Sequence, residues 1–225
     1  MKSKMIDFYT KIAETNKFPS ALFFCLILLM VFNVILSLPI TQRISEIMFS
    51  SMNVPEEQMN MMMGIMQKMK YVSIVSALFT GAVYIFVVSL ILYLLCKLFR
   101  AKITYWGAMT VFLVGALFHT LNDIINTGIT LFKGLEQISS PYDVYHTGLN
   151  VLTSVEQIGV AGYILLSNIT VLGVLFVIII AIGLKFVCNI SKFKASIIAI
   201  ILWLLLASFT VASVSLSSMA SNLPR

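Results

Sequence analysis

Residues 18–38 read FPSALFFCLILLMVFNVILSL, a run without a single charged side chain. A helix needs about 20 consecutive apolar residues to cross the hydrocarbon core of a bilayer. The run has that length, and Pro19 at its start and Pro39 just after its end are typical of helix boundaries. This stretch predicts an uncleaved helix that spans a membrane.

Four further apolar stretches follow along the chain. They are solidly apolar instead of alternating, which excludes a transmembrane β-barrel, and each must satisfy its own backbone amides as a helix. The five predicted spans cover residues 18–38, 71–96, 105–130, 160–187 and 195–216. The predicted fold is all-α: a polytopic membrane protein with five transmembrane helices, made of a segment at residues 1–17 and a single domain at residues 18–225.

The composition of the whole chain excludes a water-soluble protein. Of the 225 residues, 60% are hydrophobic and only 11% are charged, and the mean hydropathy is +1.00. A soluble domain carries about 25% charged residues. The net charge of +6 is not accompanied by a basic run interleaved with aromatic residues, so the bilayer is a predicted partner and nucleic acid is not.

Basic residues are divided unevenly between the two sides of the predicted membrane. Ten of the 15 lie on the side of the N-terminus: Lys2, Lys4, Lys11, Lys17, Lys97, Arg100, Lys102, Lys185, Lys192 and Lys194. The two loops on this side are short and basic, whereas the two loops on the other side are long and carry most of the acidic residues. The positive-inside rule therefore predicts a cytoplasmic N-terminus and an outer C-terminus.

The first long outer loop contains a methionine-rich segment at residues 53–70. One predicted helical face, with spacings of i, i+3, i+4, i+7 and i+10, consists of Met59, Met62, Met63, Met66 and Met69. We interpret it as an amphipathic interfacial helix whose flexible methionines form a partner surface. Copper handling is the alternative, since thioethers bind Cu(I). The loop has no histidine or cysteine, so no metal ligand or cofactor is predicted.

The second long outer loop covers residues 131–159 and predicts a second interfacial helix. One shared helical face consists of Val144, Gly148, Val151, Leu152, Val155 and Ile158. A mainly apolar face of this kind is typical of a helix that lies along a membrane surface.

Polar residues interrupt the outer part of the third span. They share one stripe of the helix, which consists of His119, Asn122, Asp123 and Asn126. Burying an ionised carboxylate at the bilayer centre costs about 2.5–3.5 kcal/mol, so the stripe should face protein, water or the interface. Three interpretations remain open: an inert interfacial stripe, hydrogen bonds to Asn33 or to polar residues of the fourth span such as Asn168, and a polar pocket or proton path.

Small residues in the second span predict a close helix contact. Ser73, Ala77 and Gly81 repeat every four residues. This spacing lets two helix backbones approach each other, either inside the bundle or between two copies of the chain.

Short enzyme motifs are missing from the sequence. It contains no P-loop, no H-E-x-x-H, no G-x-S-x-G and no C-x-x-C, and its two histidines are few for a metal site. We predict a non-enzymatic protein with no catalytic residues.

Three segments of the second half carry a family resemblance. Residues 101–109 read AKITYWGAM, residues 182–195 read IGLKFVCNISKFKA, and residues 201–204 read ILWL. The glycine late in the fourth span, the Ser-Lys-x-Lys-Ala turn and the tryptophan in the fifth span resemble the bacterial branch of the Yip family. These five-span membrane proteins are named for their interaction with Ypt/Rab GTPases.

The resemblance implies a partner role and no catalytic residues. Eukaryotic members bind Rab GTPases or one another in early secretory trafficking, and bacterial members assist ABC-type efflux systems or peptide resistance. Eukaryotic members have a long acidic N-terminal region, whereas about 17 residues precede the first predicted span here. The resemblance therefore implies a multi-pass protein of the bacterial cytoplasmic membrane.

The predicted function is that of an accessory or assembly partner of other membrane proteins. An ABC-type export or peptide-resistance system is the expected partner, with self-association as a further form of assembly. Two alternatives stay open: a small-molecule or ion transporter that uses the polar stripe and Asn168, and envelope copper handling by the methionine segment.

Overall fold

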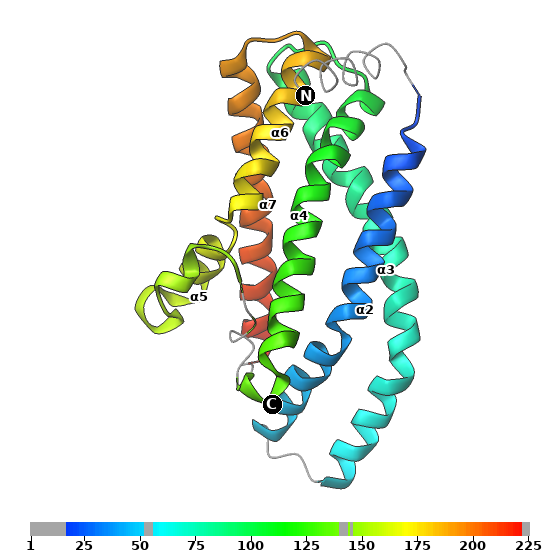
Figure 1. The fold of residues 1–225 in the computed structure, drawn as a ribbon, viewed down its shortest axis with the longest axis vertical. Coiled ribbons are helices and arrows are strands. Elements are labelled where there is room, and N and C mark those ends of the chain that lie inside the picture. Colours follow the sequence, from blue (N-terminus) through cyan, green and yellow to red (C-terminus); the bar gives the residue numbers. More distant parts are fainter. Residues whose placement is uncertain (1–16, 52–55, 140–143, 145, 222–225) are drawn as a thin grey trace.

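The computed structural model describes residues 17–51, 56–139, 144 and 146–221. Within these residues the protein is all-α, as predicted, and five helices are long and apolar enough to cross a membrane. An elongated bundle is formed by α2 (Ser20–Ser51), α3 (Glu56–Leu98), α4 (Tyr105–Lys133), α6 (Val171–Cys188) and α7 (Lys192–Ser221) (Figure 1). A sixth helix, α5 (Val155–Ser167), projects from the side of the bundle. Two 3-10 helices, η1 (Leu135–Gln137) and η3 (Leu149–Leu152), precede α5.

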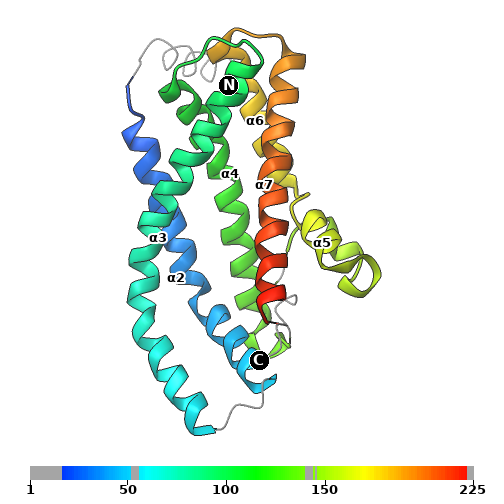
Figure 2. The ribbon, with the colours of Figure 1, turned by 180° about the vertical axis from the view of Figure 1, so that it is seen from behind.

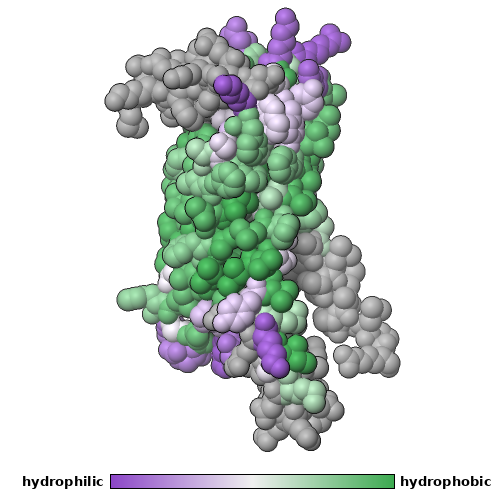
Figure 3. Space-filling model, turned by 90° about the vertical axis from the view of Figure 1, so that its right-hand side faces the viewer, coloured by the Kyte–Doolittle hydropathy of each residue, from purple (hydrophilic) through white to green (hydrophobic). Residues whose placement is uncertain are grey.

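Charged residues gather at the two ends of the bundle. The start of α2 and the turns from α3 to α4 and from α6 to α7 lie at one end, which we call the basic end (Figures 1 and 2). The residues of these turns include Arg100, Lys102 and Lys192. Figure 3 shows an apolar band between two hydrophilic ends, the pattern of a bilayer-spanning protein. Which end faces the cytoplasm stays a prediction.

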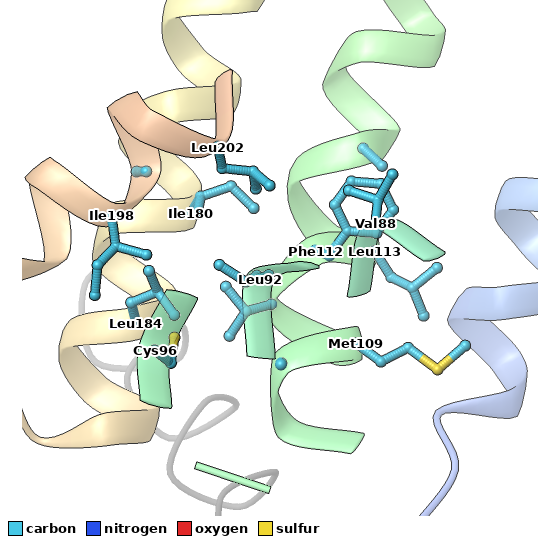
Figure 4. Close-up of a cluster of buried hydrophobic side chains, with 14 of the residues drawn as sticks. Val88, Leu92, Cys96, Met109, Phe112, Leu113, Ile180, Leu184, Ile198 and Leu202 are labelled. Atoms are coloured by element: carbon cyan, nitrogen blue, oxygen red, sulfur yellow. The ribbon is translucent and has the colours of Figure 1, made fainter. Parts of the chain in front are cut away.

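Helix α4 lies at the centre of the bundle and carries much of its core. It packs against α2, α3 and α6 (Figure 1). In the half of the bundle nearer the basic end, buried apolar side chains of α3, α4, α6 and α7 meet around Leu92, Phe112, Ile180 and Leu202 (Figure 4). This packing fixes α4, so polar side chains further along the same helix have defined neighbours.

The predicted helix boundary at Pro39 was wrong. Helix α2 continues through Pro39 to Ser51 instead of ending at residue 38. Proline removes one backbone hydrogen bond, but Ile40 beyond it is only 5% exposed and anchors the next turn. The hydroxyls of Thr41 and Ser45 also donate to carbonyls one turn earlier, at 3.1 and 2.9 Å. Burial of Ile40 thus holds the helix together beyond the proline, and the two hydroxyl groups satisfy their own hydrogen bonds within it.

From Glu56 on, the methionine-rich segment is helical, as predicted, but it is not a separate interfacial helix. It forms the first part of α3, which runs without interruption for 43 residues. The segment contains mostly methionine, glutamine and lysine, which are strong helix formers, and no proline separates it from the span. Of the predicted methionine face, only the Met69 side chain belongs to the described part. The side chains of the other four methionines of this face lie outside the described part: Met59, Met62, Met63 and Met66.

The predicted fourth span, residues 160–187, is divided into α5 and α6. Thr170 has an extended backbone, and its hydroxyl accepts the Gly173 N–H at 2.8 Å as the N-cap of α6. The Asn168 amide donates to the Ile164 carbonyl at 2.8 Å at the end of α5. Polar residues thus cap two helix ends instead of lying inside one span. The predicted helical face of residues 144–158 is divided as well. Val151 and Leu152 lie in η3, Val155 and Ile158 lie in α5, and Val144 and Gly148 precede both helices.

One of the small residues of α3, Gly81, lies at a contact with α2 of the same chain. A Cβ atom there would lie 3.4 Å from Ile27 Cδ1 and 3.4 Å from Met30 Sδ, both on α2. Ser73, at the other end of the predicted stripe, is exposed. The repeat of small residues in α3 therefore contributes to the α2–α3 contact at Gly81, its C-terminal member.

Replacing Gly115 with alanine is expected to destabilise the bundle by about 1–3 kcal/mol, because α4 and α6 approach closely there. The added Cβ would lie 2.7 Å from Ile180 Cδ1 and 2.9 Å from Ile180 Cγ1, and Ile180 is 0% exposed, so its side chain would have to shift within the core. Thermal unfolding in detergent measures the loss. The matched control is Gly128→Ala in the same helix, where nothing lies within 4 Å of the new atom. Equal unfolding temperatures of the two variants would contradict the close α4–α6 contact.

Candidate functional site

A cavity of about 360 Å³ lies between α2, α3, α4 and α6, inside the apolar band. Most of its wall is apolar and includes Leu26, Met30 and Phe176. The polar residues of the wall are Asn33, Thr80, Tyr84, His119, Thr120 and Asp123. The cavity therefore combines a large apolar surface with a small polar region, as pockets for small molecules usually do.

Two residues of the predicted polar stripe, His119 and Asp123, line this cavity. They lie four residues apart, so they are neighbours on α4 and interact electrostatically. Tyr84 of α3 lines the same cavity. No lysine or arginine lines the cavity among the described residues. A carboxyl group whose basic neighbour in the described wall is one histidine favours a ligand that carries positive charge or several hydrogen-bond donors.

The other two residues of the stripe, Asn122 and Asn126, do not line the cavity. Both are buried, and both bind the loop that precedes η3. The Thr147 backbone N–H donates to Asn126 Oδ1 at 3.0 Å, and the Thr147 hydroxyl donates to Asn122 Oδ1 at 3.0 Å. The stripe therefore separates into a cavity-lining pair and a loop-anchoring pair.

A hydrogen bond joins the first and third spans, although not through the stripe itself. The Thr127 hydroxyl donates to Asn33 Oδ1 at 3.1 Å. Such bonds between membrane helices contribute on average about 0.6 kcal/mol. The sequence indicated Asn33 as a partner, but it did not identify Thr127, which lies next to Asn126.

Asn168 belongs to the fourth-span region but is not hydrogen-bonded to the stripe. Besides the bond to its own helix, it lines a small cavity of about 60 Å³. That cavity shares Tyr84, His119 and Phe176 with the larger one. His119 therefore lies where the two spaces meet, with its ring centroid 6.2 Å from that of Phe176.

Sequence reasoning missed Thr80 and Tyr84 on the second span. They lie four residues apart on one face of a span without charged residues, and that spacing was the available signal. Within the part of the chain that the structure describes, no group of three His, Cys, Asp or Glu residues is placed to hold a metal ion. Methionine thioethers are not among these four residue types, so copper binding by the methionines stays a prediction.

The chain matches one protein family over almost its whole length. The family model described as the Yip1 domain matches residues 6–214. The match includes the cavity, both halves of the polar stripe and every helix from α2 into α7. No curated protein and no solved structure matches the chain.

Proposed function

Because the chain belongs to the Yip family, we propose that it is a non-enzymatic membrane protein that assembles with other membrane proteins. An accessory role beside an export system, such as an ABC-type transporter of a bacterial cytoplasmic membrane, is the specific form of this proposal. The resemblance of the α6–α7 turn to the bacterial branch supports that form, and the shape of α3 supports assembly in general.

The N-terminal part of α3 is the feature that carries the proposal. A helix of 43 residues is about 65 Å long, roughly twice the hydrocarbon thickness of a bilayer. Its N-terminal part reaches beyond the ends of α4 and α7 (Figures 1 and 2). Met61, Ile65 and Met69 recur there every four residues and are 67%, 51% and 52% exposed. We call these three residues the α3 apolar face.

Exposed apolar side chains beyond the bilayer are unfavourable unless they contact another molecule. Methionine suits such a surface, since its side chain is flexible and polarisable and adapts to a partner. The α3 apolar face therefore supports a protein partner at the end of the molecule opposite the basic end.

A photo-crosslinking residue at position 65 is expected to capture a membrane protein partner in native membranes. The matched control is position 94 of the same helix, because Leu94 is similarly exposed at 55% but lies within the apolar band. Adding Ile65→Lys beside a crosslinker at position 69 should lower the adduct yield at least about fivefold, since truncating a central contact costs more than about 1 kcal/mol. Mass spectrometry identifies the adducts.

The outcomes of this experiment separate the alternatives. A transporter subunit at position 65 supports the accessory role, and a second copy of the chain supports self-association. Adducts with lipid alone at both positions would contradict the proposed assembly.

A second candidate function is transport of a small molecule or ion through the intramembrane cavity. The observation that favours it is the pair His119 and Asp123 in a cavity of about 360 Å³. Ionisable residues are costly inside a membrane, so they usually serve binding or transport. The carboxyl group of Asp123 in a mostly apolar wall favours a lipophilic cation as the ligand class.

A further inference from the structure

Two buried cysteines meet at the basic end of the bundle. Cys96 lies in the last turn of α3, and Cys188 is the last residue of α6. They are 0% and 6% exposed, and both belong to the cluster of buried side chains that α3, α4, α6 and α7 form. Figure 4 shows Cys96 beside Leu184, which lies one turn before Cys188 on α6. Both cysteines are free thiols in the structure.

The two thiol groups are in direct contact. A hydrogen bond joins the side chains of Cys96 and Cys188. Both backbones are held by the turns that follow them. The Ala101 N–H donates to the Cys96 carbonyl at 2.8 Å, and Asn189 ends α6 in a left-handed conformation with a φ of 50°. Groups that are held together in this way react as if at very high concentration.

The thiol contact connects two helices that have different main neighbours. Helix α3 packs mainly against α2 and α4, whereas α6 packs mainly against α4 and α7. A covalent bond between Cys96 and Cys188 would therefore link α3 directly to α6 at the basic end.

A single buried cysteine is an ordinary core side chain and is inert toward oxidants. Two thiols in contact differ from it, because a sulfenic acid formed at one of them condenses with the other to a disulfide. Cys188 is the more accessible of the two and is the site of the first oxidation. Cys96 lies against it from the core and supplies the second sulfur.

We propose that Cys96 and Cys188 form a reversible oxidation site, at which hydrogen peroxide converts the two thiols into a disulfide. The Cys188 sulfur attacks one peroxide oxygen, the O–O bond breaks, and the released hydroxide leaves as water with the Cys188 thiol proton. The Cys96 sulfur then attacks the sulfur of the sulfenic acid. The S–O bond breaks, and hydroxide leaves as a second water with the Cys96 thiol proton. The two thiols lose two electrons and two protons in total, and one hydrogen peroxide is reduced to two waters.

Treatment of the full-length protein in nanodiscs with hydrogen peroxide tests the proposal. We expect intact mass spectrometry to show the loss of two hydrogen atoms, and peptide mapping to show residues 96 and 188 joined. Dithiothreitol should restore the reduced protein. Cys188→Ala should abolish the loss of the two hydrogen atoms. Cys25→Ser is the matched control and should keep the yield of the joined peptides, because Cys25 is an exposed cysteine of α2 outside the buried cluster.

Thermal unfolding shows whether the bond fits the folded protein. A disulfide that preserves the native geometry restricts the unfolded chain and so stabilises the folded state. The oxidised wild-type protein should therefore unfold about 5–10 °C above the reduced protein. This comparison uses two forms of the same chain, so it does not depend on whether Cys188→Ala folds.

Three results would overturn the proposal. The first is an absence of peptides joined through residues 96 and 188 at peroxide concentrations that oxidise Cys25. The second is an oxidised protein that unfolds no higher than the reduced one, because the bond would then require a distorted or unfolded chain. The third is a product that dithiothreitol does not reduce, which would show oxidation of the thiols beyond the disulfide stage.

Discussion

Replacing Asp123 with asparagine is expected to weaken the binding of a lipophilic cation, such as tetraphenylphosphonium, at least about tenfold. Asp123 supplies the carboxyl group of the intramembrane cavity, and asparagine preserves its size. Two unit charges about 4 Å apart attract each other by about 4 kcal/mol at an effective dielectric constant of about 20. A tenfold loss of affinity corresponds to about 1.4 kcal/mol, which is less than this attraction. We therefore expect at least a tenfold loss, even though the cost of removing water from the two charges offsets part of the attraction.

Isothermal titration of the protein in nanodiscs measures this loss, and uptake into liposomes then tests transport. Glu156→Gln is the matched control, because Glu156 is an exposed carboxylate on α5 outside the cavity. Both variants should keep the wild-type unfolding temperature. Equal affinities of the wild-type protein and Asp123→Asn for the cation would contradict a ligand role of the cavity. Binding of the cation without uptake into liposomes would contradict transport but would still support ligand binding in the cavity.

The five spans could be predicted from the sequence, because hydrocarbon thickness fixes how long an apolar run must be. The ends of the helices depend on local contacts that hydropathy does not report. Pro39 was expected to end α2, but burial of Ile40 continues the helix. Thr170 lies inside the predicted fourth span, and its hydroxyl still begins a new helix. Burial of a single side chain and a single hydroxyl cap decide where these helices begin and end, and a hydropathy profile reports neither.

The polar stripe of α4 was recognised as a unit, but its two functions were not separable from the sequence. At about 100° per residue, Asp123 lies about 40° to one side of His119 and Asn122 about 60° to the other. The stripe is therefore wide enough to meet two different neighbours. Only the positions of α3 and of the Thr147 loop show that Asp123 lines a cavity while Asn122 binds a loop.

The continuity of α3 illustrates a related limit. The change from methionine-rich to uniformly apolar sequence near Tyr71 indicated a boundary between two helices. Hydropathy changes there, but helix propensity does not, and backbone hydrogen bonds continue. A change in solvent environment along a helix is thus not evidence for a break in it. This continuity is what carries the α3 apolar face away from the bundle.

The loop next to Asn122 and Asn126 leads to the second large effect, which is expected from Gly148→Ala. A Cβ atom at residue 148 would lie 2.5 Å from the Ser167 carbonyl oxygen and 2.7 Å from that of Leu166. These are backbone atoms at the end of α5, so they cannot move aside as a flexible side chain would. The loop must shift instead, and the Leu149–Ile169 hydrogen bond lies beside the clash.

We expect Gly148→Ala to cost about 2–4 kcal/mol, from the steric clash and the weakened hydrogen bonds of Thr147 and Leu149. Thermal unfolding in detergent reports the loss, and faster proteolysis within residues 146–152 locates it. Gly64→Ala is the matched control, because nothing lies within 4 Å of a Cβ atom at that exposed position of α3. Wild-type stability and proteolysis in Gly148→Ala would show that the loop does not depend on this close contact with α5.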